Sequence, residues 1–154
     1  MIKVSIAEQL LYHRRLTGVV CVYPISTASR GAGNQEGSLQ TPLGKHRIHQ
    51  KIGDSNPLYT FYVAREPKGI FTQKRRAERA DWILTRILWL EGCQTGFNRR
   101  GQVDSRRRFI YIHGTNEEEL IGSPASHGCV RMRNVDMMDL FKHVQLGESV
   151  YIKG

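Results

Sequence analysis

The stretch YIHGTNEEELIGSPASHGCVRM, residues 111–132, says more about this chain than any other segment. A short apolar run, Phe109 to Ile112, leads into His113 and Gly114, and Cys129 follows sixteen positions after His113. One loop can therefore bring a thiol and an imidazole together. A free cysteine titrates near ~8.5, so at neutral pH it needs a neighbouring base to become a nucleophilic thiolate. The spacing predicts that Cys129 is a nucleophile and that His113 is its base.

The residues before the thiol also fit acyl chemistry. Gly128 lets the backbone turn tightly and leaves room for a substrate carbonyl. The N–H groups of Gly128 and Cys129 are predicted to point at the oxygen of that carbonyl. Donors in such positions stabilise the negative charge that develops there during nucleophilic attack.

Working outward, three further segments join this one: TPLG at Thr41 to Gly44, YPIST at Tyr23 to Thr27, and GESVYI near the end. Together with HGT and IGSPASHGCVRM they resemble the catalytic domain of the YkuD-type L,D-transpeptidases, from about Ile2 to Lys153. The resemblance implies a mostly β sandwich with a short helix after the cysteine loop, in a single domain over 1–154. It implies no cofactor and no metal.

The resemblance also implies roles for individual residues. Cys129 corresponds to the nucleophile and His113 to the base, with the carbonyl of Gly114 oriented to hold the imidazole. Ser126, His127 and Gly128 frame the oxyanion hole, where we favour a positioning role for His127 over general-base catalysis. Arg131 stands where the family has Arg or Asn, and its guanidinium fork could either pair with substrate carboxylates or brace the loop.

In that family the cysteine attacks the carbonyl of the L-centre of meso-diaminopimelate in a peptidoglycan tetrapeptide stem, and D-Ala leaves. Water as acceptor gives an L,D-carboxypeptidase; an amine gives 3→3 cross-links or lipoprotein attachment. We expect no export signal in the first residues, because Glu8 and Gln9 interrupt the apolar core that a signal peptide needs. If Met1 is the native start, we expect a cytoplasmic carboxypeptidase that acts on recycled muropeptides; a removed signal peptide would make it periplasmic.

Composition limits the other possibilities. The 154 residues are 40% hydrophobic and 24% charged, as expected for one globular domain, and no apolar run is long enough for a membrane span. The net charge is +9, and residues 65–108 hold twelve basic and five acidic side chains. This basic region is predicted to overlie the active site, with Arg86, Arg99 and Arg100 as candidate substrate contacts. The loop at 26–40 is a second candidate lid.

Two other classes of protein fit less of the sequence. A noncatalytic module for nucleic acid or an anionic polymer would explain the charge but not the pairing of His113 with Cys129, and no nucleic-acid motif is present, so we expect no nucleic-acid partner. A zinc hydrolase using His113, His127 and Cys129 lacks an HExxH motif. The three cysteines have no CxxC spacing, which suits a reducing compartment. The sequence leaves the oligomeric state open.

Apolar and β-branched runs between Gly, Pro and Asn clusters predict strands. These are Val19 to Ile25, Lys45 to Lys51, Tyr59 to Ala64, Phe109 to Ile112 and the final ESVYIKG. The segment 74–91 fits either a helix or a strand from Trp82 to Leu90 after a short basic helix or loop; we favour the strand. A helix is predicted from Asn134, as its cap, to before Gly147, with Val135, Met138, Leu140 and Phe141 on its apolar face.

Overall fold

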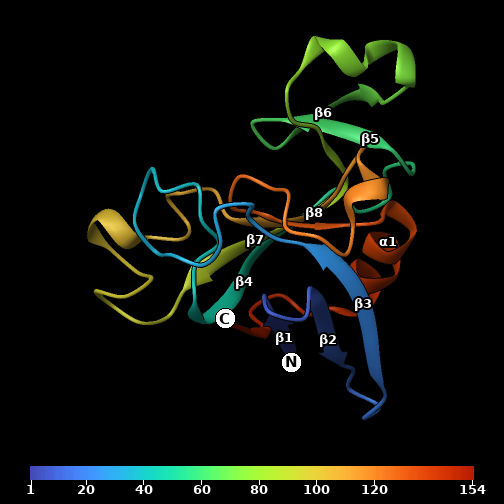
Figure 1. The fold of residues 1–154 in the computed structure, drawn as a ribbon. Helices are drawn as coiled ribbons and strands as arrows, with labels where there is room; N and C mark the ends of the chain where they lie inside the picture. The colour runs from blue at the N-terminus through green and yellow to red at the C-terminus, as the bar shows by residue number, and fades with distance from the viewer.

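The computed structural model describes residues 1–154 and consists mainly of β-strands with one α-helix (Figure 1). The strands are β1 (Ile2–Ser5), β2 (Leu10–Arg14), β3 (Val20–Ser26), β4 (Gly44–Ile52), β5 (Thr60–Val63), β6 (Glu66–Ile70), β7 (Ile83–Gly92), β8 (Tyr111–Gly114), β9 (Val130–Met132) and β10 (Ser149–Lys153). The helix is α1 (Asn134–His143), and 3₁₀ turns cover η1 (Gln73–Glu78), η2 (Gly101–Val103) and η3 (Glu118–Leu120).

The strands form one sheet that closes on itself. Its order is β4-β10-β1-β2-β3-β9-β8-β7-β5-β6, and β4 also pairs with β7. The sheet therefore curls into a flattened, two-layered sandwich, and only the β5–β6 hairpin lies outside the closed ring. The parallel pair β8–β9 is part of this ring. On one side of the pair, β8 also forms hydrogen bonds with β7.

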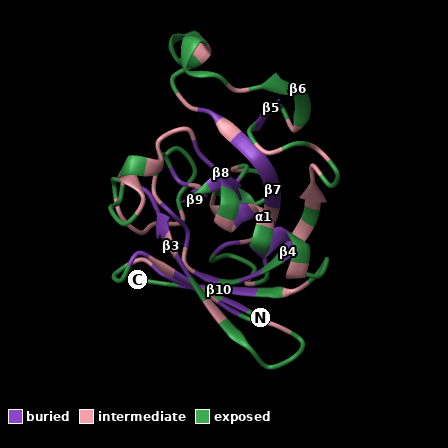
Figure 2. Ribbon diagram, turned by 90° about the vertical axis from the view of Figure 1, so that its right-hand side faces the viewer, coloured by how far each residue is buried: buried purple, intermediate pink, exposed green.

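The core lies inside this sandwich, where alternate residues of the strands meet α1. Leu88, Ile112 and Val130 are fully buried and pack with Met137 and Leu140 of the helix. Figure 2 shows the buried residues gathered along these strands. Because side chains alternate along a strand, the residues between these core positions point to the other face of the sheet. That face holds the residues discussed below.

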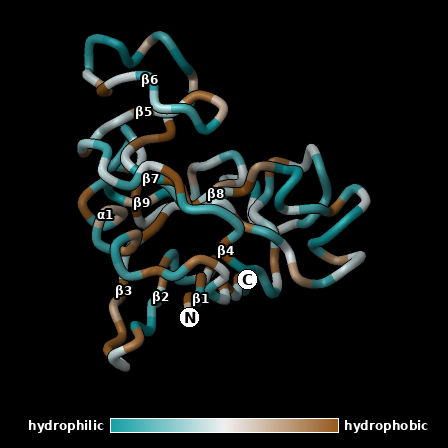
Figure 3. The backbone as a smooth tube through the Cα atoms, turned by 180° about the vertical axis from the view of Figure 1, so that it is seen from behind, coloured by the Kyte–Doolittle hydropathy of each residue, from teal (hydrophilic) through white to brown (hydrophobic).

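A separate layer stands above the sheet: the β5–β6 hairpin and η1, called here the hairpin lid (residues 60–81). In Figures 1 and 3 it projects from the body, and its outer turns are largely hydrophilic. All five residues of β6 are exposed. Its inner side rests on a small cluster in which Phe61 and Phe71 contact the buried ring of Trp82 edge-on.

Several predicted elements are confirmed. The ambiguous segment 74–91 is a 3₁₀ turn followed by β7, as favoured, and the final segment forms β10. Strands β1, β2 and β6 have no counterpart among the elements predicted from the sequence. No helix of the structure has the length and apolar character needed to cross a bilayer.

Two local predictions were wrong. Phe109 is not in a strand: its φ of 56° lies in the left-handed region, and β8 begins at Tyr111. Asn134 does not cap α1 with its side chain; it is the first helical residue, and the carboxylate of Glu118 accepts its N–H at 2.8 Å.

The apolar face of α1 also differs from the prediction. Leu140 and Phe141 are buried as expected, but the third buried apolar residue is Met137, whereas Val135 is 65% exposed.

Candidate active site

Strand β8, which carries His113, and the segment leading into β9, which carries Cys129, bring the predicted base and nucleophile to the same face of the sheet. In their parallel register His113 lies opposite Arg131. Tyr111, two residues before His113, and Cys129, two residues before Arg131, project to the same side because side chains alternate. Cys129 indeed packs beside Tyr111 in a cluster on this face. The pairing of a thiol with an imidazole, predicted from spacing alone, is therefore compatible with the fold.

The sulfur of Cys129 is held by the backbone just before and within β8. Its Sγ accepts the N–H of Tyr111 at 3.4 Å and donates its proton to the carbonyl of Phe109, also at 3.4 Å. Burial among neighbouring groups raises the pKa of the thiol to about 12, because the charged thiolate would be poorly solvated. In the resting protein Cys129 is therefore a protonated thiol.

The imidazole of His113 is oriented as predicted. Its Nδ1 bonds to the carbonyl of Gly114 at 2.6 Å, and this carbonyl can only accept, so Nδ1 carries the proton. The buried Nε2 has no hydrogen-bond partner. Burial lowers the pKa of His113, which keeps the ring neutral. His113 thus presents an unprotonated nitrogen on the same face as Cys129, as a general base requires.

Gly114 is needed for a steric reason as well. A Cβ atom at this position would collide with Oδ1 of Asn134 and with the carbonyl of Leu84. Asn134 Oδ1 accepts the hydroxyl of Thr85 at 2.6 Å, and its Nδ2 donates to the carbonyl of Thr115 at 2.7 Å. This buried network fixes the strand that carries His113 against the start of α1.

Hydrogen bonds also hold the loop before Cys129 in place. Ser126 Oγ donates to the carbonyl of Cys129 at 2.6 Å and accepts the N–H of Gly128 at 3.2 Å. Thr41, from the TPLG turn, donates its hydroxyl to the carbonyl of Gly128 at 3.0 Å. The backbone of Gly128 has a φ of 136°, which only glycine adopts without strain. Ser126 and Gly128 therefore shape the loop that carries the sulfur.

The predicted oxyanion hole needs one correction. The N–H of Gly128 is already bonded to Ser126 and does not point freely at a substrate. The N–H of Cys129 has no hydrogen-bond partner within the chain and remains the available donor. The side chain of His127 is exposed and makes no hydrogen bond, so no contact in the structure gives it a role in proton transfer.

Arg131 braces the site. Only 2% of its side chain is exposed, and it donates to Asp81 at 2.9 Å and to Glu117 at 3.3 Å. A third contact runs to the carbonyl of Ala125, next to Ser126, at 3.4 Å. Of the two roles left open by the sequence, these contacts favour bracing of the loop over pairing with a substrate carboxylate.

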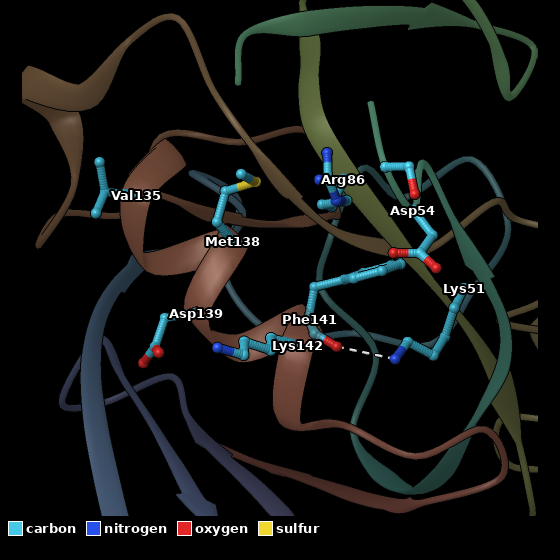
Figure 4. Close-up of a pocket in the computed structure, with 9 residues that line it drawn as sticks. Lys51, Asp54, Arg86, Val135, Met138, Asp139, Phe141 and Lys142 are labelled. Carbon is cyan, nitrogen blue, oxygen red and sulfur yellow. Dashed lines mark hydrogen bonds between the residues drawn. The ribbon is translucent and has the colours of Figure 1, made fainter. Parts of the chain in front are cut away.

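The three arginines predicted to contact substrate lie elsewhere. Arg86 lines a cavity of about 820 Å³ between β4 and α1, which Figure 4 shows, together with Lys51 and Phe141. Its guanidinium donates to the carbonyl of Thr85 at 2.6 Å. Arg99 and Arg100 belong to the loop before η2, where the backbone N–H of Arg100 donates to Asp104. None of the three has a hydrogen bond to Cys129 or His113; the side chain of Arg86 donates only to the backbone of Thr85, in the network behind His113.

Sequence reasoning missed other residues beside the sulfur. Arg108 crosses to the loop at 26–40, where it donates to the carbonyl of Gln40 at 2.6 Å, and its charge acts to lower the pKa of Cys129. Arg65 of the hairpin lid donates to the hydroxyl of Tyr111 at 3.0 Å. Arg65 and Arg108 are the two ends of the basic region 65–108, which was predicted as a whole to overlie the active site, but no motif singled out either residue.

The ligand set of the zinc alternative does not assemble. No group of three His, Cys, Asp or Glu side chains in the structure is arranged to share a metal ion. His127 is exposed, whereas His113 is fully buried. The geometry around Cys129 instead suits nucleophilic attack with His113 as proton acceptor.

The site therefore sits in a mostly β sandwich, with a backbone-oriented histidine on β8 and a cysteine directly before the neighbouring parallel strand β9. Residues 1–152 match the L,D-transpeptidase catalytic domain family, YkuD, and the chain belongs to this family. The sandwich fold and the family predicted from the sequence are thereby confirmed.

Curated relatives and solved structures agree with this family. The chain is 45% identical over 58 residues to the putative L,D-transpeptidase YqjB of Bacillus subtilis, covering 37% of this chain and 31% of the relative. It is 51% identical over 43 residues to the probable L,D-transpeptidase YbiS of Escherichia coli, covering 28% and 14%.

Among solved structures, the L,D-transpeptidase of Xylanimonas cellulosilytica gives a TM-score of 0.61 at 17% identity, over 99% of this chain and 59% of that one. The C442S mutant of the Enterococcus faecium enzyme gives 0.58 at 16%, over 99% and 48%. These structures support the fold. The matched region spans about a third or less of the two curated relatives and about half of the two solved chains.

Proposed function

We propose that this chain cleaves peptidoglycan tetrapeptide stems by cysteine acyl transfer and releases D-Ala, with water as the favoured acceptor. The proposal rests on one observation: His113 presents an unprotonated, unpartnered Nε2 on the face of the sheet that carries the thiol of Cys129. The family supplies the substrate class. The reaction is then an L,D-carboxypeptidation that converts a tetrapeptide stem to a tripeptide stem.

Acylation begins with a proton transfer. The thiol of Cys129 swings from the carbonyl of Phe109 and gives its proton to Nε2 of His113 as the sulfur attacks the carbonyl of the meso-diaminopimelate L-centre. Hydrogen bonds of this kind are often formed only once the substrate is bound. The negative charge that develops on the carbonyl oxygen is stabilised by the free N–H of Cys129. The tetrahedral intermediate collapses, the C–N bond breaks, and the imidazolium protonates the departing amine of D-Ala.

Deacylation uses the same base. Nε2 of His113 accepts a proton from water, the resulting hydroxide attacks the thioester, and the C–S bond breaks. The imidazolium then returns its proton to the sulfur of Cys129, and the tripeptide acid leaves. Because burial favours both the neutral thiol and the neutral ring, the proton is transferred during each attack and not held as a resting thiolate–imidazolium pair.

The test is product analysis by mass spectrometry with a purified disaccharide-tetrapeptide. We expect free D-Ala and a tripeptide stem that takes up one oxygen atom from labelled water. A Cys129→Ser variant serves as the control and should release no D-Ala. Absence of D-Ala release from every stem offered would overturn the proposal.

A second candidate function is favoured by the relatives, which are named as putative or probable L,D-transpeptidases. With an amine acceptor, the same thioester would give 3→3 cross-linked stems or attach a lipoprotein. Adding a second stem with a free side-chain amine separates the two: a dominant cross-linked dimer would identify a transpeptidase. The cellular compartment, cytoplasmic or periplasmic, stays a prediction that localisation of the tagged full-length protein would decide.

A further inference from the structure

An arginine of the hairpin lid lies on aromatic rings beside the catalytic sulfur. The guanidinium of Arg65 is 4.7 Å from the ring centre of Trp89 and 5.1 Å from that of Phe109. It also donates from Nη1 to the hydroxyl of Tyr111 at 3.0 Å. Three aromatic residues from two parts of the chain therefore hold one cation, which we call the Arg65 platform (Arg65, Trp89, Phe109, Tyr111).

The platform is directly coupled to Cys129. The carbonyl of Phe109 accepts the thiol proton, and the N–H of Tyr111 donates to the sulfur. The two residues that hold the nucleophile thus also hold the guanidinium. A group bound to Arg65 would lie over the same two residues as a group attached to the sulfur.

The guanidinium is also free to bind an anion. No carboxylate lies within ion-pair distance of Arg65, whereas Arg131 and Arg76, nearby in the fold, each contact two. Stacking on aromatic rings leaves the N–H groups at the edge of the planar fork able to donate to a carboxylate. Of the five N–H groups of the guanidinium, one donates to Tyr111 and four have no partner within the chain.

The backbone at Arg65 and at Phe109 has positive φ for two different reasons. Ala64 and Arg65 are the two residues of the β5–β6 turn, and their φ of 48° and 68° are what the common two-residue hairpin turns require. Phe109, in the turn before β8, has a φ of 56°. A bulky residue such as Phe is rarely found there, and such strain concentrates at binding and catalytic sites. The side chain of Phe109 is 51% exposed, so its ring covers the guanidinium without closing the site.

We infer that Arg65 is a specificity-determining residue that binds a free carboxylate of the acyl-donor stem, with the exposed ring of Phe109 against the adjoining aliphatic part. The inference rests on the proposed function, since the stem supplies the carboxylate. A tetrapeptide stem offers three: those of the D-glutamate, of the D-centre of diaminopimelate, and of the terminal D-Ala. All three share the chemistry that Arg65 recognises.

Selective amidation distinguishes these sources. We would measure kcat and KM for D-Ala release, or for release of its amide, with four stems: one unmodified and three singly amidated. One amidation is expected to lower kcat/KM roughly 10- to 100-fold, the range of a charged hydrogen bond. In Arg65→Met that preference should shrink to within a few-fold, mainly through a higher KM for the unmodified stem.

The design includes a matched control. Arg79 of the hairpin lid also lies over aromatic rings, 5.8 Å from Phe61 and 5.7 Å from the adjoining Trp82, but makes no hydrogen bond to Tyr111. Arg79→Met should retain the full carboxylate preference. If Arg65→Met does not fold, as judged by circular dichroism, Arg65→Lys keeps the charge without the fork and should show a reduced preference.

The outcomes are distinguishable. If the unmodified chain releases D-Ala from no stem, the proposed function fails. If the chain is active but shows no preference for any free carboxylate, or if a folded Arg65 variant keeps that preference, the inference about Arg65 is overturned while the proposed function stands.

Discussion

The β8–β9 strand pair and the hairpin lid flank the same sulfur but are built in opposite ways. Every residue of β8 and β9 is buried, and backbone ladders on both sides fix their register. Every residue of β6 is exposed, and the lid rests on one small aromatic cluster and on contacts made by charged side chains. The comparison suggests a division of work: the buried pair fixes reacting atoms, and the exposed lid presents recognition groups.

The largest expected effect lies in the buried pair. Cys129→Ala should lower kcat/KM for D-Ala release by at least about 10⁴-fold, because no other group can form the acyl-enzyme. Loss of labelling by iodoacetamide at this position, mapped by mass spectrometry, checks the assignment. Cys93→Ala, which removes an exposed thiol, should leave the rate unchanged. Substantial activity in Cys129→Ala would remove the basis for the comparison.

The pH dependence should report the same burial. The pKa of Cys129 is raised to about 12, so in a Cys93→Ala background its alkylation rate should rise about tenfold per pH unit from 7 to 9 without levelling off. The pKa of His113 is lowered below its ordinary value of 6.5, and only the neutral ring accepts a proton. The acid limb of kcat/KM should therefore lie below pH 6.5. An alkylation plateau near neutrality would indicate a resting thiolate instead.

The buried strand pair could be predicted from the sequence better than the exposed lid. The thiol and imidazole of Cys129 and His113 lie on one short segment, so their spacing revealed them. The strand of residues 83–92 was predictable because β-branched and aromatic residues favour pleated surfaces. Gly128 was misjudged because a local hydroxyl, that of Ser126, competes for its N–H, a choice that spacing does not resolve.

The recognition side could not be predicted in the same way. Arg65 and Phe109 are far apart in the sequence and meet only because the hairpin folds back over β7 and β8. Arg86 was chosen for its charge within a basic region, but Thr85 and Arg86 occupy a bulge between β7 and β8 that directs the guanidinium into the cavity beside α1. The alternation of side chains along a strand predicts which face of the sheet a residue lies on only where the backbone pairing contains no bulge.

Glu117 allows the two regions to be compared at one carboxylate, because it forms ion pairs with the buried Arg131 and with the exposed Arg76 of the lid. Arg131→Met should reduce the free energy of unfolding by about 2 kcal/mol, because Arg131 is almost fully buried and its removal leaves Asp81 without an ion-pair partner and Glu117 with only the exposed Arg76. Urea denaturation measures this. Both carboxylates are partly exposed and can be rehydrated, which keeps the cost below that of a fully buried pair. A loss under about 0.5 kcal/mol would show that the bracing contacts are dispensable.

The smallest effect is expected on the lid side of the same carboxylate. Arg76 is half exposed and lies 3.7 Å from Glu117 and 3.8 Å from Glu119. Arg76→Met should change the free energy of unfolding by less than about 0.5 kcal/mol, and about 0.5 M salt should remove the difference. The backbone carbonyl of Arg76 accepts the indole N–H of Trp82 at 3.1 Å. This hydrogen bond remains in the variant, so the lid should stay packed on Trp82. If Arg76→Met instead cost as much as Arg131→Met, the exposed lid would be part of what fixes the buried strand pair, and the two regions could not be treated as separate in chemistry and recognition.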